Sequence, residues 1–390
     1  MKLYDRSRVV TDWTCPRKRY WGYEWEGKGL VGSNIHLELF TGTTLHDGLA
    51  AIAAFHRGTG SVDIDAIATT ANRQMAEGLL TSTSGEVSEV DFALEQAALV
   101  EGLLRGFHKY VWPQLMGQYP NILHIEEEMK YEHDGLTFMS RPDLVIGNDN
   151  GDVVYVEYKS TSSKKEGWIN SWGTAVQLHS TIKAIEATTG RKVDSVIVQG
   201  LYKGFESYGK QSSPFCYGYH RYGNPPFSKT ETIYEWKAGF KRTPTWEMEG
   251  GVKAWVDGMP PEVIANQFPQ TPQIFVNEDM ISSFFNQRKW REKEIELAMN
   301  MLPDIVNEDG VIEVLDVTFP QKFDQCIPAF GKPCEYRKLC FGHVENPLEE
   351  GYQVRVPHHQ AELESWNETE VLVSNNNTLL SSVREGESVS

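Results

Sequence analysis

The sequence lacks the features that mark several large protein classes. No apolar run approaches the ~20 residues that a membrane-spanning helix needs. The opening residues, MKLYDRSRVVTDW, contain no apolar centre of a signal peptide. The phosphate-binding patterns GxxxxGKS and GxxxxGKT do not occur, so we do not expect ATP-driven translocation within this chain. The lack of a membrane-spanning run and of a signal peptide predicts a cytoplasmic protein that does not contact a membrane.

Positive charge and cysteine are also scarce. The 390 residues include 37 Lys and Arg against 54 Asp and Glu, which gives a net charge of −17. This balance argues against a protein that coats nucleic acid through an overall basic surface. It does not exclude a nuclease, because active-site carboxylates add negative charge while a local basic groove can bind phosphates. Five cysteines, an odd number, make a disulfide framework unexpected.

The pattern of apolar residues predicts alternating helices and strands. We expect helices at about 44–56 and 91–115, separated by a polar surface excursion with a short helix at 57–90. The segment ILHIEEEMKYE is predicted to be one strand, HDG a tight turn, LTFMSRPDLVIGN the returning strand and VVYVEYKS a third strand. A helix from about 168 to 189 then precedes a fourth strand, KVDSVIVQGLYKG. A helix that crosses between strands predicts an α/β fold with a mixed β-sheet core flanked by helices.

This organisation divides the chain into five parts. They are an N-terminal segment at 1–30, a core with a helical insertion at 31–205, an extension of unknown role at 206–320, a cysteine-rich segment at 321–345 and a polar tail at 360–390 that we expect to be disordered.

Charged residues end the third predicted strand in an unusual way. Glu157 and Lys159 follow four apolar residues and point to the same face, because side chains alternate along a strand. Asp143 lies on the preceding strand, where hairpin pairing can bring it beside Glu157. Two adjacent carboxylates repel unless a cation lies between them, and hard oxygen ligands select Mg²⁺ or Mn²⁺. The simpler alternative is an ion pair of Glu157 with Lys159 or with Arg141.

His46 adds a candidate ligand from the first predicted helix. A histidine at such a position is more often a surface or core residue of the helix. Beside a carboxylate metal site, however, it would be a third ligand, and its imidazole would favour Mn²⁺ over Mg²⁺. Asp47 is the alternative ligand on the same helix.

The order of the motifs GTTLH, RPDLVI, VEYKS and VQLHSTIKAI resembles the PD-(D/E)XK nuclease superfamily, in its RecB-type branch. The resemblance implies a restriction-endonuclease-like core. The matching positions are His46, Asp143, Glu157, Lys159 and Gln177.

This resemblance also implies roles for the matching residues. His46, Asp143 and Glu157 would bind the divalent ions together with the backbone carbonyl of Tyr158. Water activated by one or two such ions would then attack the phosphodiester, with Lys159 orienting or deprotonating that water.

Gln177 would help to position the catalytic lysine or the scissile strand in such a nuclease. Many members of the branch carry a tyrosine four residues after this glutamine. The present chain has Thr181 there, and Tyr202 on the following strand is the candidate to take the place of that tyrosine.

Four of the cysteines form a second pattern. Cys326, Cys334 and Cys340 are spaced as C-x7-C-x5-C, and Cys15 lies about 310 residues earlier. Four thiolates can bind zinc or a cubic iron–sulfur cluster, and zinc sites usually pair their cysteines in short knuckles. Buried free thiols are the simpler alternative.

The motifs CPRKRY and CEYRKLC resemble the iron–sulfur staple of CRISPR-associated exonucleases and of RecB-related helicase–nucleases. A 4Fe–4S cluster would then clip the N- and C-terminal segments around the core. Cys216 is the spare cysteine that could replace Cys326 as a ligand.

Basic and aromatic residues that could bind phosphates and bases occur in two places. Core aromatics with surface lysines are the simpler explanation for both. The candidates are Arg17, Lys18, Arg19, Tyr20, Trp168, Tyr202 and Lys203.

The resemblance predicts a Mg²⁺- or Mn²⁺-dependent deoxyribonuclease. We expect an exonuclease that acts on DNA ends or single strands in recombination, repair, or phage- or CRISPR-related processing, with a recombination or helicase protein as partner. The alternative is a nonenzymatic iron–sulfur DNA-binding module on the same fold.

Overall fold

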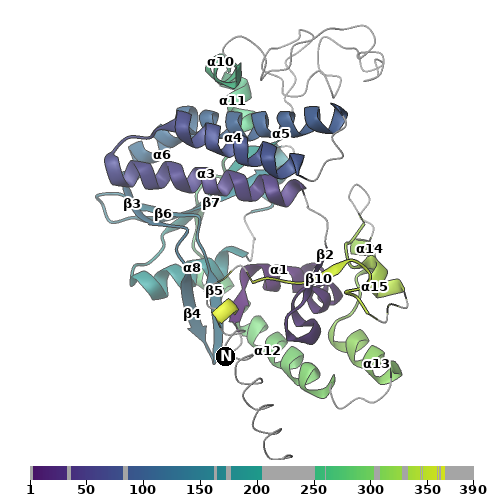
Figure 1. Cartoon of the computed structure of the whole chain (residues 1–390). Coiled ribbons are helices and arrows are strands. Elements are labelled where there is room, and N and C mark those ends of the chain that lie inside the picture. Colours follow the sequence, from purple (N-terminus) through teal and green to yellow (C-terminus); the bar gives the residue numbers. More distant parts are fainter. Residues whose placement is uncertain are drawn as a thin grey trace, which may run out of the picture.

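The computed structural model describes most of the chain up to residue 364. The described residues are 3–32, 37–81, 87–161, 165–172, 177–203, 251–259, 261–302, 308–326, 333–342, 344, 346–357, 359 and 362–364. Figure 1 shows a layer of long helices above a sheet, with further helices and the two terminal segments on the other side.

A five-stranded mixed sheet forms the centre of the fold. Its order is β3 (Asn121–Ile125), β6 (Leu144–Gly147), β7 (Val153–Thr161), β8 (Ser195–Tyr202) and β9 (Ile274–Phe275). Strands β7 and β8 are parallel, while the other neighbours are antiparallel. The first six residues of β7 are buried, as a strand covered on both faces requires. The predicted mixed α/β architecture is therefore confirmed.

A smaller sheet continues from the hairpin. It has the order β1 (Leu3–Asp5), β5 (Leu136–Ser140) and β4 (Met129–His133), with β1 parallel to β5. The predicted HDG turn is confirmed, because Asp134 and Gly135 have φ values of 50° and 82° between the paired residues His133 and Leu136.

Each long strand expected in this hairpin is divided in two. The first breaks at Glu126, whose φ of 48° is left-handed, and the second breaks at residues 141–143. Pro142 explains the second break, because proline has no N–H to donate within a sheet. The two breaks lie side by side, since the Glu126 N–H donates to the Pro142 carbonyl at 3.1 Å.

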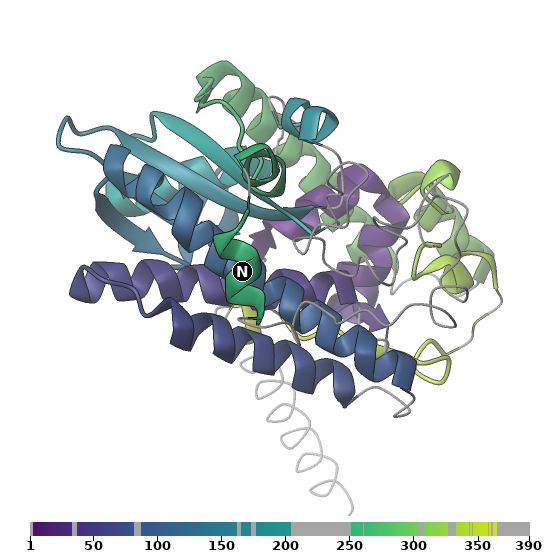
Figure 2. The same ribbon diagram turned by 90° about the horizontal axis from the view of Figure 1, so that it is seen from above.

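Helices α3 (Leu37–Thr59), α4 (Ile64–Leu80) and α5 (Val87–Gly106) form the layer above β3, β6 and β7 (Figures 1 and 2). A π-helical turn at Phe107–Val111 leads from α5 into α6 (Trp112–Gln118). The expected surface excursion at 57–90 is wrong, because α4 has 17 residues and buries Ile67, Ala71 and Met75. These residues are four apart, so they form one apolar face against α3 and α5.

The opposite side carries α7 (Lys165–Asn170), α8 (Gln177–Thr189) and α12 (Glu278–Met301). Helix α8 packs against β4 and β5. The one helix expected between β7 and β8 is thus two helices in the described residues.

An N-terminal segment and a segment from the last part of the described chain meet beside this core. The N-terminal segment contains α1 (Arg6–Thr14), α2 (Pro16–Arg19), two further helical turns at Tyr20–Glu24 and Trp25–Gly27, and β2 (Leu30–Gly32). Strand β2 pairs antiparallel with β10 (Tyr352–Val354). The helices α13 (Glu308–Thr318), α14 (Phe323–Cys326) and α15 (Arg337–Phe341) lie alongside in Figure 1.

The predicted extension at 206–320 adds to the core where it is described. Strand β9 extends the central sheet, and α10 (Gly251–Asp257) packs on α5, followed by α11 (Pro261–Gln267). Residues 204–250, which include Cys216, lie outside the described residues.

The expected disordered tail at 360–390 needs correction at its start. Glu362 is buried and binds Arg8 at 3.0 Å and Arg355 at 2.6 Å. Residues 365–390 lie outside the described residues. Among the helices that are described, none has the length and apolar character to cross a membrane.

Candidate metal centre

Strand pairing places Asp143 beside the end of β7. Leu144 pairs with Val156 in the antiparallel β6–β7 ladder, so the preceding residue, Asp143, lies opposite Glu157. The backbone N–H of Tyr158 donates to Asp143 Oδ2 at 2.6 Å. The hairpin juxtaposition expected from the sequence is therefore present in the structure.

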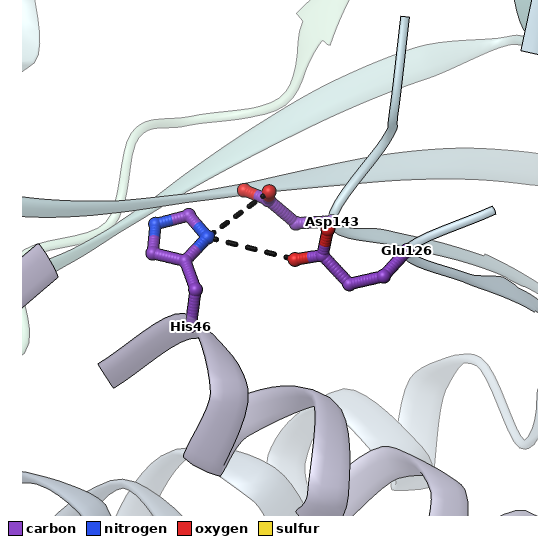
Figure 3. Close-up of side chains that lie close together, drawn as sticks. All are labelled: His46, Glu126 and Asp143. Atoms are coloured by element: carbon purple, nitrogen blue, oxygen red, sulfur yellow. Dashed lines mark ion pairs between the residues drawn. The ribbon is translucent and has the colours of Figure 1, made fainter. Parts of the chain in front are cut away.

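Helix α3 brings His46 to this point, and β3 brings a carboxylate that was not predicted. His46 Nδ1 lies 3.2 Å from Asp143 Oδ1 and 3.6 Å from Glu126 Oε1 (Figure 3). These three residues form the one group in the described part of the chain with three potential ligand atoms within 4.8 Å of one another. Asp47, the alternative on the helix, is exposed and outside the group.

Glu126 occupies its position because of the strand break. It follows Ile125, which pairs with Leu144, so the ladder puts Glu126 next to Asp143. Its left-handed φ costs on the order of 1–3 kcal/mol, and such strain clusters at functional sites. The sequence contained one signal for this residue: three consecutive glutamates, 126–128, directly after a strand that precedes RPD.

The charges of the three residues depend on one another. Burial lowers the pKa of His46, but Asp143 and Glu126 outweigh burial and raise it to about 10. Burial raises the pKa of Asp143, while the His46 charge lowers it to about 2. The pKa of Glu126 is raised by burial and by Asp143. Without a metal, a protonated imidazole therefore balances the carboxylates.

The donor set suits a divalent cation that prefers oxygen with one nitrogen. Neighbouring ligands of an octahedral ion at about 2.1 Å lie about 3 Å apart, close to the observed 3.2 and 3.6 Å. Two carboxylates and one imidazole match Mn²⁺, and Mg²⁺ with additional waters. A bound ion would replace the proton on His46.

Glu157 is completely buried at the end of β7 and is bound by cations. Its carboxylate contacts the Lys159 ammonium and the Tyr155 hydroxyl, and Arg6 Nη1 lies 2.6 Å from Oε1. Glu157 is not in the three-ligand group of the described residues. The simple ion pair of Glu157 and Lys159 therefore exists in the structure, next to the candidate metal centre.

Other candidate site residues surround the same strand end. The Tyr158 ring is buried edge-on to His46 and Phe107, and its hydroxyl has no hydrogen-bond partner among the described residues. Thr181 lies in α8, where its hydroxyl is 2.9 Å from Ser140 Oγ. Gln177 is the first residue of α8, and its side chain lies outside the described part.

The four motif cysteines come together from the two ends of the chain. Cys15 lies between α1 and α2, and the Cys334 N–H donates to the Cys326 carbonyl at 3.0 Å. Burial raises the pKa of the Cys334 and Cys326 thiols, and the charge of Cys15 raises both further. The pKa of Cys340 is raised to about 11 by burial, with contributions from Cys334 and Cys15. Cys15 therefore lies within electrostatic reach of each of the other three thiols, and Cys334 lies within reach of Cys340.

The separation of these thiols distinguishes between two kinds of centre. Thiolates on a single zinc ion, each about 2.3 Å from it, lie within about 4 Å of one another. No three of these four cysteines, all of them described, have sulfurs within 4.8 Å of one another. The thiols therefore do not have the close spacing of ligands on a single zinc ion.

A cation lies near each of three of the cysteines. Lys18 lowers the pKa of Cys334, Arg337 lowers that of Cys326, and Arg17 lowers that of Cys340, in each case against the larger effect of burial.

The predicted nucleic-acid contacts need correction. Arg19 is fully buried and binds Glu292 through two hydrogen bonds, and Arg17 is buried against Asp316 and the Phe319 carbonyl. Tyr20 and Trp168 are also buried, because they contribute to apolar clusters. Such side chains cannot bind a passing strand.

Three of the predicted contact residues stay accessible. Lys18 is partly exposed and pairs with Glu335 at 3.1 Å. Tyr202 and Lys203 are partly exposed at the end of β8.

Comparison with known proteins gives weak likenesses. No protein-family model matches the chain, and no curated protein matches it. One similar crystal structure is described as "Putative exonuclease" from Eubacterium rectale. The superposition covers 87% of this chain and 93% of the other chain, with 10% sequence identity and a TM-score of 0.37. For a crystal structure described as SSO0001, the superposition covers 35% of this chain and 72% of the other chain, with 16% sequence identity and a TM-score of 0.21. At these TM-scores, neither likeness carries a fold or a function over to this chain.

Proposed function

We propose that this protein is a metal-dependent deoxyribonuclease, an exonuclease on DNA ends or single strands. One observation carries the proposal: His46, Glu126 and Asp143 converge within ligand distance of one another, beside the Glu157–Lys159 end of β7. Oxygen-rich metal sites next to a lysine suit phosphodiester hydrolysis, because both groups stabilise negative charge on the phosphate.

We assign a different role to each residue of the site. His46, Glu126 and Asp143 would hold Mn²⁺ or Mg²⁺, which when bound polarises the phosphate and lowers the pKa of water. Lys159, held by Glu157, would orient the attacking water and stabilise charge on the phosphate. Tyr158 fixes Asp143 through its backbone N–H and lies edge-on to His46. Its carbonyl is the further ligand that the PD-(D/E)XK resemblance implies.

A 4Fe–4S cluster on Cys15, Cys326, Cys334 and Cys340 is the second part of the proposal. Its support is the electrostatic influence of Cys15 on the other three thiols and the cation near each of those three. Its role would be to hold the terminal segments together, which reduces the chain entropy lost on folding.

The nuclease proposal is tested with end-labelled single- and double-stranded DNA and with circular single-stranded DNA, each incubated with Mn²⁺. We expect wild type to shorten the linear substrates and to spare the circle. Lys159→Ala should lose at least about 100-fold in rate. Lys293→Ala, which removes the same charge from an exposed site on α12, should cleave as wild type does.

Equal persistence of all substrates with wild type and Lys159→Ala would refute the nuclease. Metal-independent DNA binding without cleavage would favour the nonenzymatic iron–sulfur module instead. For the cluster, protein purified without oxygen should be brown and contain iron and sulfide, and Cys340→Ser should lose both. A colourless protein that contains zinc would contradict it.

A further inference from the structure

Arg6 reaches the candidate site from the opposite end of the sequence. It directly follows β1, whose Asp5 pairs with Met139 of β5, and its charge lies within electrostatic reach of Asp143. Asp5 also caps α1, because its carboxylate accepts the Arg8 N–H at 2.6 Å. A strand on one side and a capped helix on the other therefore fix the place where this side chain begins.

The guanidinium of Arg6 binds the most buried carboxylate of the site. Nη1 lies 2.6 Å from Glu157 Oε1, and Glu157 has no exposed surface. The Arg6 side chain itself is 25% exposed, so this residue, unlike Glu157, keeps some contact with solvent. Arginine has five N–H donors in a planar fork, and the bond to Glu157 leaves others for a second anion.

Both oxygens of Glu157 are already occupied. Oε1 is shared by Arg6 and Lys159, and Oε2 accepts the Tyr155 hydroxyl. Because Oε1 already accepts from two cations, a divalent cation can bind through Oε1 only if one of them leaves it. Lys159 lies on the same strand, whereas Arg6 comes from a separate segment that only borders the site.

We propose that Arg6 is a phosphate-binding residue of this site. Before the metal binds, Arg6 neutralises the charge of Glu157. When a divalent cation takes the place of Arg6 on Glu157, the Arg6 guanidinium turns to a phosphate of the DNA backbone. The geometry suits this exchange, because a guanidinium fork matches two phosphate oxygens as well as it matches a carboxylate. The proposal rests on the proposed nuclease function, to which it adds one residue and an order of events. It also explains why a buried carboxylate at this site carries two cations.

Two measurements without catalysis test the exchange. The first is calorimetric titration of Mn²⁺ into the DNA-free protein. Arg6→Ala should bind Mn²⁺ at least about threefold more tightly, because the competing cation is gone. The second is binding of a labelled single-stranded oligonucleotide with Ca²⁺ in place of Mn²⁺. Arg6→Ala should weaken this binding by about tenfold, as expected for the loss of a charge-assisted contact.

Two further variants make the comparison specific. Arg57→Ala removes an arginine of α3 that pairs with Glu127 at 3.7 Å, and it should leave both affinities unchanged. Arg6→Lys keeps the charge but lacks the fork, so Mn²⁺ affinity should stay near wild type while oligonucleotide binding weakens. If Arg6→Ala does not fold, the affinity of Arg6→Lys for the oligonucleotide tests by itself whether Arg6 contacts phosphate.

Unchanged oligonucleotide binding in the folded Arg6 variants overturns the proposal, with or without tighter Mn²⁺ binding. Failure of the nuclease itself appears differently. A wild-type protein that binds Mn²⁺ and the oligonucleotide but cleaves no DNA refutes the enzyme, and the affinities of the Arg6 variants still decide whether Arg6 contacts phosphate.

Discussion

The two ends of helix α1 contact two clusters of buried charge that differ in their balance. At its C-terminal half, Asp12 enters a group that we call the balanced cluster. Its members are Asp12, Arg19, Glu24, Arg288, Arg291 and Glu292. Three carboxylates face three arginines here, and Arg19 binds both oxygens of Glu292 at 2.7 and 2.5 Å.

At the other end of α1, Arg6 enters the candidate site. Three carboxylates, those of Glu126, Asp143 and Glu157, meet two permanent cations there, Arg6 and Lys159. His46 supplies the missing charge only by holding a proton. The candidate site therefore reaches charge balance only through a proton on His46, whereas the balanced cluster reaches it with arginines alone.

This difference separates a structural role from a functional one. A complete set of buried ion pairs holds elements together and needs nothing from solvent, although it adds little net stability compared with an apolar core. A set that is balanced by a proton on an imidazole can exchange that proton for a metal ion, because imidazole nitrogen and carboxylate oxygen are both metal ligands. The positive charge of the replaced proton predicts that the ligand is a cation.

Breaking the balanced cluster should have the largest effect. Glu292→Ala leaves Arg19 buried without its two-point partner and should lower the free energy of unfolding by about 3–5 kcal/mol. Chemical denaturation of the full chain measures this loss. Glu296→Ala, an exposed position on the same helix, should change it by less than about 0.5 kcal/mol. Equal losses from both variants would show that the cluster is not structural.

Removing one charge while keeping the shape should have a smaller, pH-dependent effect. Burial raises the pKa of Asp12, but hydrogen bonds and charge from Arg291 and Arg19 outweigh it and lower the pKa below its ordinary 3.8. A lowered pKa contributes stability above pH 3.8, which is lost as the pH falls through the folded value. Asp12→Asn should therefore cost about 2 kcal/mol at pH 7.

Urea denaturation of wild type and Asp12→Asn from pH 7 to pH 3 tests this dependence. The gap between the two midpoints should be constant down to about pH 4 and should then narrow. A gap that widens in acid would contradict the assignment of Asp12 to the balanced cluster.

The smallest effect on stability is expected at the candidate site. Burial, followed by the Asp143 charge, raises the pKa of Glu126, so its ionised form is unfavourable in the metal-free fold. Glu126→Gln removes that cost and should change the free energy of unfolding by no more than about 1 kcal/mol, towards greater stability. The same variant should weaken Mn²⁺ binding by at least about tenfold, as second carboxylates of such sites do.

Denaturation in EDTA and Mn²⁺ titration measure the two effects of Glu126→Gln separately. A large loss of stability with unchanged Mn²⁺ affinity would show that Glu126 has a structural role, as the balanced cluster does, and is not a metal ligand.

Local patterns predicted much of the part of the fold that contains the candidate site. The HDG turn, the buried β7 strand and the pairing of Asp143 with Glu157 all follow from alternation and turn chemistry over about 30 residues. The parallel β7–β8 pair follows from the helical crossover between them.

Long-range contacts could not be predicted in the same way. Arg6 reaches Glu157 because β1 adds to β5, and no local pattern indicates which strand a three-residue edge segment will join. The sequence did not indicate which of the three consecutive glutamates faces the site, because the orientation of Glu126 depends on a left-handed φ at a strand break. The burial of Arg17 and Arg19 depends on α12 and α13, whose carboxylates lie about 270 to 300 residues away.

The position of α1 also bears on the order in which the protein can assemble during synthesis. Arg288 lies 276 residues after Asp12, and ribosomes add about 5–20 residues per second, so the partner of Asp12 appears on the order of tens of seconds later. Until then, Asp12 and Arg19 must remain in water, because their burial without partners would be unfavourable. The first helix of the chain is therefore among the last to find its final place.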